Sequence, residues 1–396
     1  MRCFALPPVR SPVPFRRSRG VHDRNAMIRF FDGRSVELYA SGTAALARAI
    51  AECAARTEAS VPEAIIPAYG CPNLVAACLH ASVYPRLVDL HPRGWGYDPV
   101  HLAQSVSANT IAIVAVNFLG VGDCTEALLA LSRERRIALI QDSAQFLPRV
   151  PRVWPGDYVV LSFGRGKPLN LLFGGALIAP ADPVRPLTRF PARLSWRDRI
   201  LATPASAFAF NCLTHPNAYW ALARFPGTHL GRVLYQPLGN SAPLPASAWS
   251  RVNDAFERYC LTPSYSSAPW EPVLAQWRQL GIHRLAGSPE CADHEPLRLA
   301  LVAPDRDARD TLVSALDGRG LGASCMYRSP LNQITGIPDV VVRQGPFPNA
   351  SRLADRLFTL PTYQRVTRRT IDLTHRTLLS WARVAGQKPM DGSHDE

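Results

Sequence analysis

Lysine is almost absent from this sequence of 396 residues: Lys167 and Lys388 are the only two, although lysine and arginine together number 44. An amine forms an imine with an aldehyde, whereas the guanidinium of arginine stays protonated and is a poor nucleophile. Lys388 lies in a polar C-terminal segment, where nothing would desolvate or orient its amine. Any Schiff-base chemistry in this chain must therefore use Lys167. The alternative is that Lys167 is an ordinary solvated loop residue.

Long apolar runs are also lacking, and none approaches the roughly 20 residues that a membrane-spanning helix needs. The nine cysteines form no CxxC pair and no cluster with histidine at zinc spacing, so we expect no metal site. Their odd number argues against a complete disulfide framework. The compartment we expect is therefore a reducing cytoplasm.

The net charge of +13 is not distributed as in a nucleic-acid-binding protein. No run of basic residues is interleaved with aromatics, and no helix-turn-helix or RNP pattern is present. Six of the arginines fall within residues 1–26, which are rich in proline and lack periodicity. We therefore expect residues 1–30 to be a disordered basic extension. The modest remaining excess fits an anionic substrate.

Short apolar runs alternate with helical patterns through the first half of the chain. The spacing predicts a mostly parallel, doubly wound α/β sheet covered on both faces, in a large domain over residues 36–250. We expect its first strands over 36–40, 64–67, 86–90, 111–118 and 137–141. A smaller C-terminal α+β domain is expected over 251–385, before a polar tail over 386–396. Its expected elements are strands over 297–303 and 323–327 and helices over 306–319 and 367–384.

Ligands bind beyond the carboxyl ends of the strands in such sheets. Asp142 follows the strand over 137–141, and Gln145 comes three residues later. An unpaired carboxylate at the end of a buried strand is costly, so Asp142 is a candidate partner for a cationic group. The alternative is that Asp142 caps the following turn, and that Gln145 supports the loop.

A second polar group opens the helix that follows the strand over 36–40. The backbone N–H groups of Gly42, Thr43 and Ala44 begin this helix, so they and the helix dipole can hold a phosphate. Ser162, five residues before Lys167, is a further phosphate candidate at the end of a strand. The alternative is that Ser41 or Thr43 is only an N-cap.

These groups match the needs of a pyridoxal phosphate enzyme built on such a sheet. That cofactor requires a lysine, a carboxylate against its pyridine nitrogen and donors for its phosphate. Lys167 supplies the first from a glycine-rich loop between apolar strands over 157–162 and 176–179, and Asp142 supplies the second. Gln145 is a candidate for the hydrogen bond to the phenolic oxygen of the cofactor.

Five segments of the sequence resemble the motifs of the DegT/StrS family, and they occur in the same order as in that family. Its members are pyridoxal phosphate-dependent sugar aminotransferases of fold type I. They cover residues 41–46, 65–90, 142–145, 162–176 and 347–367. The resemblance implies that Lys167 is the Schiff-base lysine and that Asp142 is the partner of the pyridine nitrogen. It implies that Gln145 binds the cofactor oxygen and that the phosphate is held by Gly42, Thr43 and Ser162. It also implies a homodimer, L-glutamate as amino donor, and a nucleotide-linked keto sugar as acceptor. The resemblance also implies that the product serves the synthesis of surface polysaccharide or of a secondary metabolite.

The chain departs from the family at Cys71, in the cofactor site, where many members place an aromatic residue over the pyridine ring. A thiol does not stack in that way, so Tyr69 or Asn117 is expected to take up part of this role. In the loop that faces the substrate, Tyr327 matches the family, whereas Asn332 stands where histidine is common.

The family also sends an asparagine from the partner subunit to the phosphate. The candidates for it within residues 190–240 are Asn211 and Asn217.

Two other functions share the predicted cofactor. Some relatives dehydrate a sugar carbon and typically carry histidine in place of the lysine, so the presence of Lys167 argues against that reaction. A cofactor-binding protein without turnover, acting as a sensor or assembly partner, stays open because of the departure at Cys71.

Overall fold

The computed structural model describes residues 4–7, 13–14, 25–123, 126–180, 196–201, 203–225, 233–262, 267–287 and 296–384. Within them, seven strands form one sheet and three strands form a second. No helix in the described ranges is long and apolar enough to span a bilayer. The same ranges hold no group of three or more His, Cys, Asp or Glu side chains suited to a metal ion.

The large sheet has the strand order β1-β7-β6-β5-β4-β2-β3. Its strands are β1 (Ser35–Tyr39), β2 (Glu63–Pro67), β3 (Tyr84–Val88), β4 (Thr110–Val116), β5 (Ala138–Asp142), β6 (Tyr158–Ser162) and β7 (Gly175–Ala179). The five strands from β3 to β6 run parallel, and β7 runs antiparallel to both β6 and β1. The predicted mostly parallel sheet is thus confirmed.

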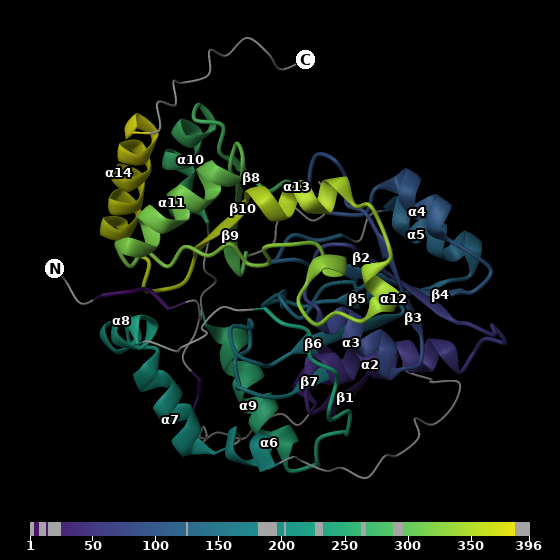
Figure 1. Cartoon of the computed structure of the whole chain (residues 1–396). Helices are drawn as coiled ribbons and strands as arrows, with labels where there is room; N and C mark the ends of the chain where they lie inside the picture. Colours follow the sequence, from purple (N-terminus) through teal and green to yellow (C-terminus); the bar gives the residue numbers. More distant parts are fainter. Residues whose placement is uncertain are drawn as a thin grey trace.

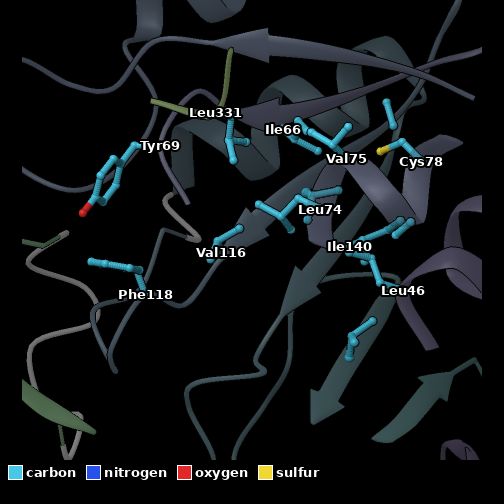
Figure 2. Close-up of a cluster of buried hydrophobic side chains, with 14 of the residues drawn as sticks. Leu46, Ile66, Tyr69, Leu74, Val75, Cys78, Val116, Phe118, Ile140 and Leu331 are labelled. Atoms are coloured by element: carbon cyan, nitrogen blue, oxygen red, sulfur yellow. The ribbon is translucent and has the colours of Figure 1, made fainter. Parts of the chain in front are cut away.

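Helices cover both faces of this sheet (Figure 1). One face carries α2 (Gly42–Ala54) and α3 (Asn73–His80), and the other carries α4 (Pro99–Ser105) and α5 (Glu126–Arg135). Alanines on α2 are fully buried, which lets this helix pack closely on the strands. Figure 2 shows the core beneath α2 and α3, where Tyr69 and Phe118 lie at one end of the aliphatic side chains.

A separate cluster packs α1 (Ala26–Phe30) and α9 (Ala248–Leu261) against β1, β6 and β7. Phe30 on α1 meets Phe256 on α9 edge to face, with ring centroids 5.0 Å apart. The domain boundary expected at residue 250 falls inside α9. The buried face of α9 belongs to this cluster.

The expected disorder of residues 1–30 does not hold for several of them. Leu6 and Val13 are each 1% exposed, and Met27 on α1 is fully buried. These residues are ordered because each fills an apolar site on the folded body, a contact that local composition does not reveal.

Three further helices precede α9: α6 (Trp196–Leu201), α7 (Pro204–Leu213) and α8 (Pro216–Arg224). Proline at the first position starts α7 and α8, because its missing N–H is not needed there. Sequence periodicity did not predict these helices, and their buried faces are narrow.

The small domain is built on a sheet of order β10-β9-β8. Its strands are β8 (His283–Arg284), β9 (Arg298–Val302) and β10 (Leu357–Pro361). Its helices are α10 (Glu271–Arg278), α11 (Arg306–Gly318), α12 (Asp339–Val342), α13 (Pro348–Arg356) and α14 (Arg368–Val384), with 3-10 turns at η1 (Ala268–Trp270) and η3 (Leu331–Gln333).

The strand predicted over residues 323–327 is wrong. Only Ser324 pairs, through an isolated bridge to Thr359. Gly322 and Met326 have φ angles of 70° and 53°, so the backbone leaves the extended conformation on both sides of that bridge.

Other segments cover both outer strands of the large sheet. At β1, the N–H of Leu244 donates to the carbonyl oxygen of Leu38 over 2.7 Å. At β3, the side-chain amide of Gln344 binds the backbone edge as a neighbouring strand would. Its Oε1 accepts from the N–H of Leu87 and its Nε2 donates to the carbonyl oxygen of Pro85, each over 2.8 Å.

Candidate active site

The predicted polar residues gather at the carboxyl edge of the large sheet. Asp142 is the last residue of β5, and the neighbouring strand β4 leads directly into Asn117. The N–H of Asn117 donates to the carbonyl oxygen of Asp142 over 2.9 Å, and its side-chain amide donates to the hydroxyl of Ser143. Asn117 and Ser143 therefore fix the backbone on which the Asp142 carboxyl is mounted. Sequence reasoning missed Ser143 and considered Asn117 only for ring contact.

The Asp142 carboxyl lies in a poorly hydrated place. Burial raises its pKa above the usual range, while the N–H of Ala144 and the positive charge of Lys167 act to lower it. The Ala144 N–H donates to Asp142 Oδ1 over 2.9 Å. The turn-cap interpretation of Asp142 is thus confirmed, and the same side chain lies within electrostatic reach of Lys167.

Lys167 lies on a loop that is closed at its base. The N–H of Leu171 donates to the carbonyl oxygen of Phe163, and the N–H of Phe163 donates to that of Gly174, each over 2.8 Å. The N–H of Lys167 itself donates to the carbonyl oxygen of Gly164 over 3.3 Å. Lys167 as a whole residue is half-buried.

The helix N-terminus of α2 meets the end of β6 without room for side chains between them. A Cβ on Gly42 would lie 2.6 Å from Ser162 Cβ, and a Cβ on Gly175 would lie 2.5 Å from the backbone N of Gly42. Real Cβ atoms do not approach so closely, so both glycines are required by the contact. The Ser162 hydroxyl is thereby held beside the first turn of α2.

The first-turn amides of α2 differ in their availability. Ser41 caps the helix, because its Oγ accepts from the N–H of Ala44 over 3.1 Å. The alternative that Ser41 is the N-cap is thus confirmed, and in this structure the cap uses the N–H of Ala44. The N–H groups of Gly42 and Thr43 have no acceptor within the helix, and the Ser162 hydroxyl lies beside Gly42.

Tyr327 lies next to Gln145 and Cys71. Its hydroxyl accepts from Gln145 Nε2 over 3.5 Å, and the thiol of Cys71 lies within hydrogen-bond reach of it. Burial, then the neighbouring Cys71 and Tyr69, raise the pKa of Tyr327 far above its usual value. Gln145 also accepts through Oε1 from the N–H of Leu119 over 2.9 Å.

Tyr69 contacts Tyr327 through both its hydroxyl and its ring. Its hydroxyl donates to the carbonyl oxygen of Tyr327 over 2.9 Å, and its ring meets those of Tyr327 and Phe118 edge to face. Figure 2 shows the hydroxyl of Tyr69 directed away from the aliphatic core. Tyr69 thus supports Tyr327.

Some predicted residues have other partners. The Asn332 amide donates to the carbonyl oxygen of Gln344 over 2.8 Å, so it holds its own loop together. Asn211 binds the backbone of Val13 through both ends of its side-chain amide. Asn217 is exposed on α8. Lys388 lies outside the described residues.

Taken together, one edge of the sheet combines three chemical capacities. The carboxyl of the half-buried Asp142 can hold a cationic nitrogen, and the N–H groups of Gly42 and Thr43 can hold an anion. The amine of Lys167 lies on the loop between β6 and β7, within electrostatic reach of Asp142. This donor set fits a ligand that carries a basic ring nitrogen, a carbonyl group and a phosphate.

Comparisons with known proteins point in the same direction. The DegT/DnrJ/EryC1/StrS aminotransferase family matches residues 26–184 and 273–378. MosB from Rhizobium meliloti is 29% identical over 119 residues, which are 30% of this chain and 23% of MosB. The chain therefore spans about a quarter of that relative.

Solved structures share the fold. DesV from S. venezuelae superposes with a TM-score of 0.61 at 18% identity, covering 90% of this chain and 87% of DesV. NtdA from Bacillus subtilis, solved with bound cofactor PMP, superposes with a TM-score of 0.66 at 15% identity, covering 91% of this chain and 76% of NtdA. At these identities the likeness establishes the fold alone.

Proposed function

Because this chain belongs to the DegT/DnrJ/EryC1/StrS aminotransferase family, we propose that it uses pyridoxal phosphate to move an amino group from L-glutamate to a nucleotide-linked keto sugar. The family match covers both the sheet edge with Asp142 and Lys167 and most of the small domain with Tyr327. NtdA, which shares the fold, was solved with the amine form of this cofactor.

The residues present fit this cofactor. The N–H groups of Gly42 and Thr43 and the hydroxyl of Ser162 would hold the phosphate, in a niche that a Cβ on Gly42 would fill. Asp142 would pair with the pyridine nitrogen, and Gln145 would lie beside the phenolic oxygen. Cys71 and Tyr327 would line the site from the other side.

When bound, pyridoxal phosphate supplies an aldehyde that condenses with amines and a ring that withdraws electrons from the reacting carbon. The Asp142 carboxylate would hold a proton on the ring nitrogen, and that positive charge would in turn keep Asp142 ionised despite its burial. Lys167 would anchor the aldehyde, and its freed amine would take a proton from the substrate carbon and return it.

One observation carries the proposal: Lys167, the only lysine among the described residues, lies within electrostatic reach of the carboxyl of the half-buried Asp142. Arginine cannot replace its amine in imine chemistry. The described residues therefore hold a single side chain for the covalent step, and it lies within electrostatic reach of the group that would tune the ring.

The finer features of the proposal concern the setting of the reaction. We propose a cytoplasmic homodimer whose partner subunit contributes to the phosphate site, as the resemblance to the family implies. The amino sugar would serve surface polysaccharide or secondary metabolite synthesis. The surplus of arginine over acidic residues favours an anionic acceptor such as a nucleotide sugar.

The test is a half-reaction. The purified protein is loaded with pyridoxal phosphate and mixed with L-glutamate, and we expect its absorbance to change to that of the pyridoxamine form as 2-oxoglutarate appears. L-Glutamine and L-alanine are tested as alternative donors, and a panel of keto sugar nucleotides then identifies the acceptor. Cofactor binding without any change on adding amino acids would instead support a sensor or assembly role and overturn the aminotransferase proposal.

A further inference from the structure

The described N-terminal residues, Phe4–Pro7 and Val13–Pro14, lie outside the part of the chain that matches the family. Even so, Leu6 and Val13 are among the most deeply buried side chains of the protein. Figure 1 shows residues 4–7 passing between α8 and the small domain. The two buried side chains contact two different parts of the molecule.

The first contact is with the small domain. The N–H of Leu6 donates to the carbonyl oxygen of Gly320 over 2.9 Å, and the Tyr363 hydroxyl donates to the carbonyl oxygen of Pro7. A Cβ on Gly320 would lie only 2.0 Å from the carbonyl oxygen of Phe4. Gly320 also has a φ of 69°, so glycine is required there both by its conformation and by the segment packed on it.

The second contact is at Val13. Asn211 on α7 binds the Val13 backbone at both polar groups: its Oδ1 accepts from the N–H over 2.7 Å and its Nδ2 donates to the carbonyl oxygen over 2.8 Å. The Val13 side chain packs with Leu172 and Ala207 in a small buried cluster. A side-chain amide that satisfies both groups of one residue fixes that residue in place.

Leu172 belongs to the loop that carries Lys167. It has a φ of 71°, the left-handed region that bulky residues avoid, and it bridges to Gly164 across the base of the loop. Its side chain is 6% exposed and packs against Val13. The packing of Val13 against Leu172 therefore offsets part of the free-energy cost of the strained backbone that closes the lysine loop.

We propose that Val13 forms a brace: it is a positioning residue that holds the lysine loop through Leu172. Leu6 makes a separate contact with Gly320 and takes no part in holding the loop. The role of the loop as carrier of the reacting amine rests on the proposed function. The brace itself is a statement about the conformation of residues 164–172.

The experiment measures amide hydrogen exchange of residues 164–172 in the protein without cofactor, and the dissociation constant of pyridoxal phosphate. We expect Val13→Ala and Asn211→Ala to speed exchange in this loop and to weaken cofactor binding about tenfold, the factor that matches the cost of one left-handed residue. Leu6→Ala is the matched control, because it removes an equally buried side chain that takes no part in holding the loop.

A coupled variant separates positioning from general loss of stability. Glycine adopts the left-handed region freely, so in a Leu172→Gly background the further change Val13→Ala should no longer affect exchange in the loop. If the rate of amide hydrogen exchange in residues 164–172 is unchanged in both Val13→Ala and Asn211→Ala, the brace proposal is overturned. Equal loosening of the loop by Leu6→Ala would also overturn it. If Val13→Ala does not fold, Asn211→Ala decides the matter.

The two proposals fail separately. A wild-type protein that binds cofactor but does not react with any amino donor refutes the aminotransferase function. In that case the exchange difference between Val13→Ala and Leu6→Ala still supports or refutes the brace.

Discussion

Asp142 accepts a hydrogen bond from the N–H of Ala144 over 2.9 Å, which leaves its second carboxyl oxygen available at the edge of the sheet. The same carboxyl has a raised pKa because burial outweighs the stabilising effects of Ala144 and Lys167. The position is thus costly for an ionised group until a cation pairs with it.

A pH dependence follows for the protein without cofactor. Because the pKa of Asp142 is raised on folding, its contribution to stability is fully present below the ordinary carboxyl pKa and is lost as the pH rises through the raised value. Asp142→Asn should therefore be stabilising at neutral pH and lose that advantage in acid. Urea midpoints of both proteins across the pH range measure this. The exposed Asp317→Asn is the control. A constant difference between Asp142→Asn and wild type at all pH values would contradict the prediction.

Replacing Lys167 should remove turnover. Lys167→Ala should lower kcat by at least about 10³-fold, since general acid-base catalysis alone contributes on the order of 10²–10⁴-fold. Lys167→Arg keeps the charge and should be equally inactive, because a guanidinium does not form the imine. Borohydride reduction of the loaded wild type, followed by peptide mass spectrometry, should attach the cofactor at position 167. Lys388→Ala, the matched control, should retain both label and activity, and a label at Lys388 would refute the assignment.

The contact between Gly42 and Ser162 should be sensitive to a single methyl group. In Gly42→Ala the new Cβ would lie 2.6 Å from Ser162 Cβ, so the helix or the strand must shift and the phosphate niche must change shape. We expect pyridoxal phosphate affinity to fall about tenfold, from an overpacking cost of roughly 1–3 kcal/mol. Gly239→Ala adds a methyl group where nothing lies within 4 Å and serves as the control. Equal affinities for the two variants, measured by fluorescence titration, would show that the niche does not hold the phosphate.

Gln145 should matter for stability as well as for the site. Its Oε1 accepts from the N–H of Leu119, a fully buried residue. Gln145→Ala leaves that N–H without an acceptor, and the free energy of unfolding should drop by about 1–3 kcal/mol without cofactor. Gln145→Glu retains an acceptor oxygen and should lose less. Denaturant titration compares the two variants, and identical losses would mean that the hydrogen bond to Leu119 contributes nothing.

Much of the fold was predictable because its signals are local. The strands of the large sheet are short apolar runs between amphipathic helices, and that alternation predicts a parallel sheet with its site at the carboxyl edge. Asp142 and Lys167 could be found for the same reason, since each follows a recognisable strand. The scarcity of lysine made the second of them conspicuous.

The remaining features depend on contacts between distant residues. The strand β8 has only two residues, which is too short for any periodic pattern, and it forms because β9 pairs with it. The Ala44 amide was expected to be available, but the Ser41 rotamer that occupies it is a feature of three-dimensional geometry. The burial of Val13 depends on Asn211, almost 200 residues away, so a composition rich in proline and arginine suggested disorder instead.

The capped borders of the large sheet bear on how this protein behaves at high concentration. Exposed strand edges let one polypeptide recruit another by continuing the ladder of backbone hydrogen bonds, which is a common beginning of aggregation. Here Leu244 occupies one border and the Gln344 amide the other, so neither β1 nor β3 offers a free template. Self-association by extension of the large sheet is therefore hindered at both of its borders, and the carboxyl edge of that sheet is left undisturbed.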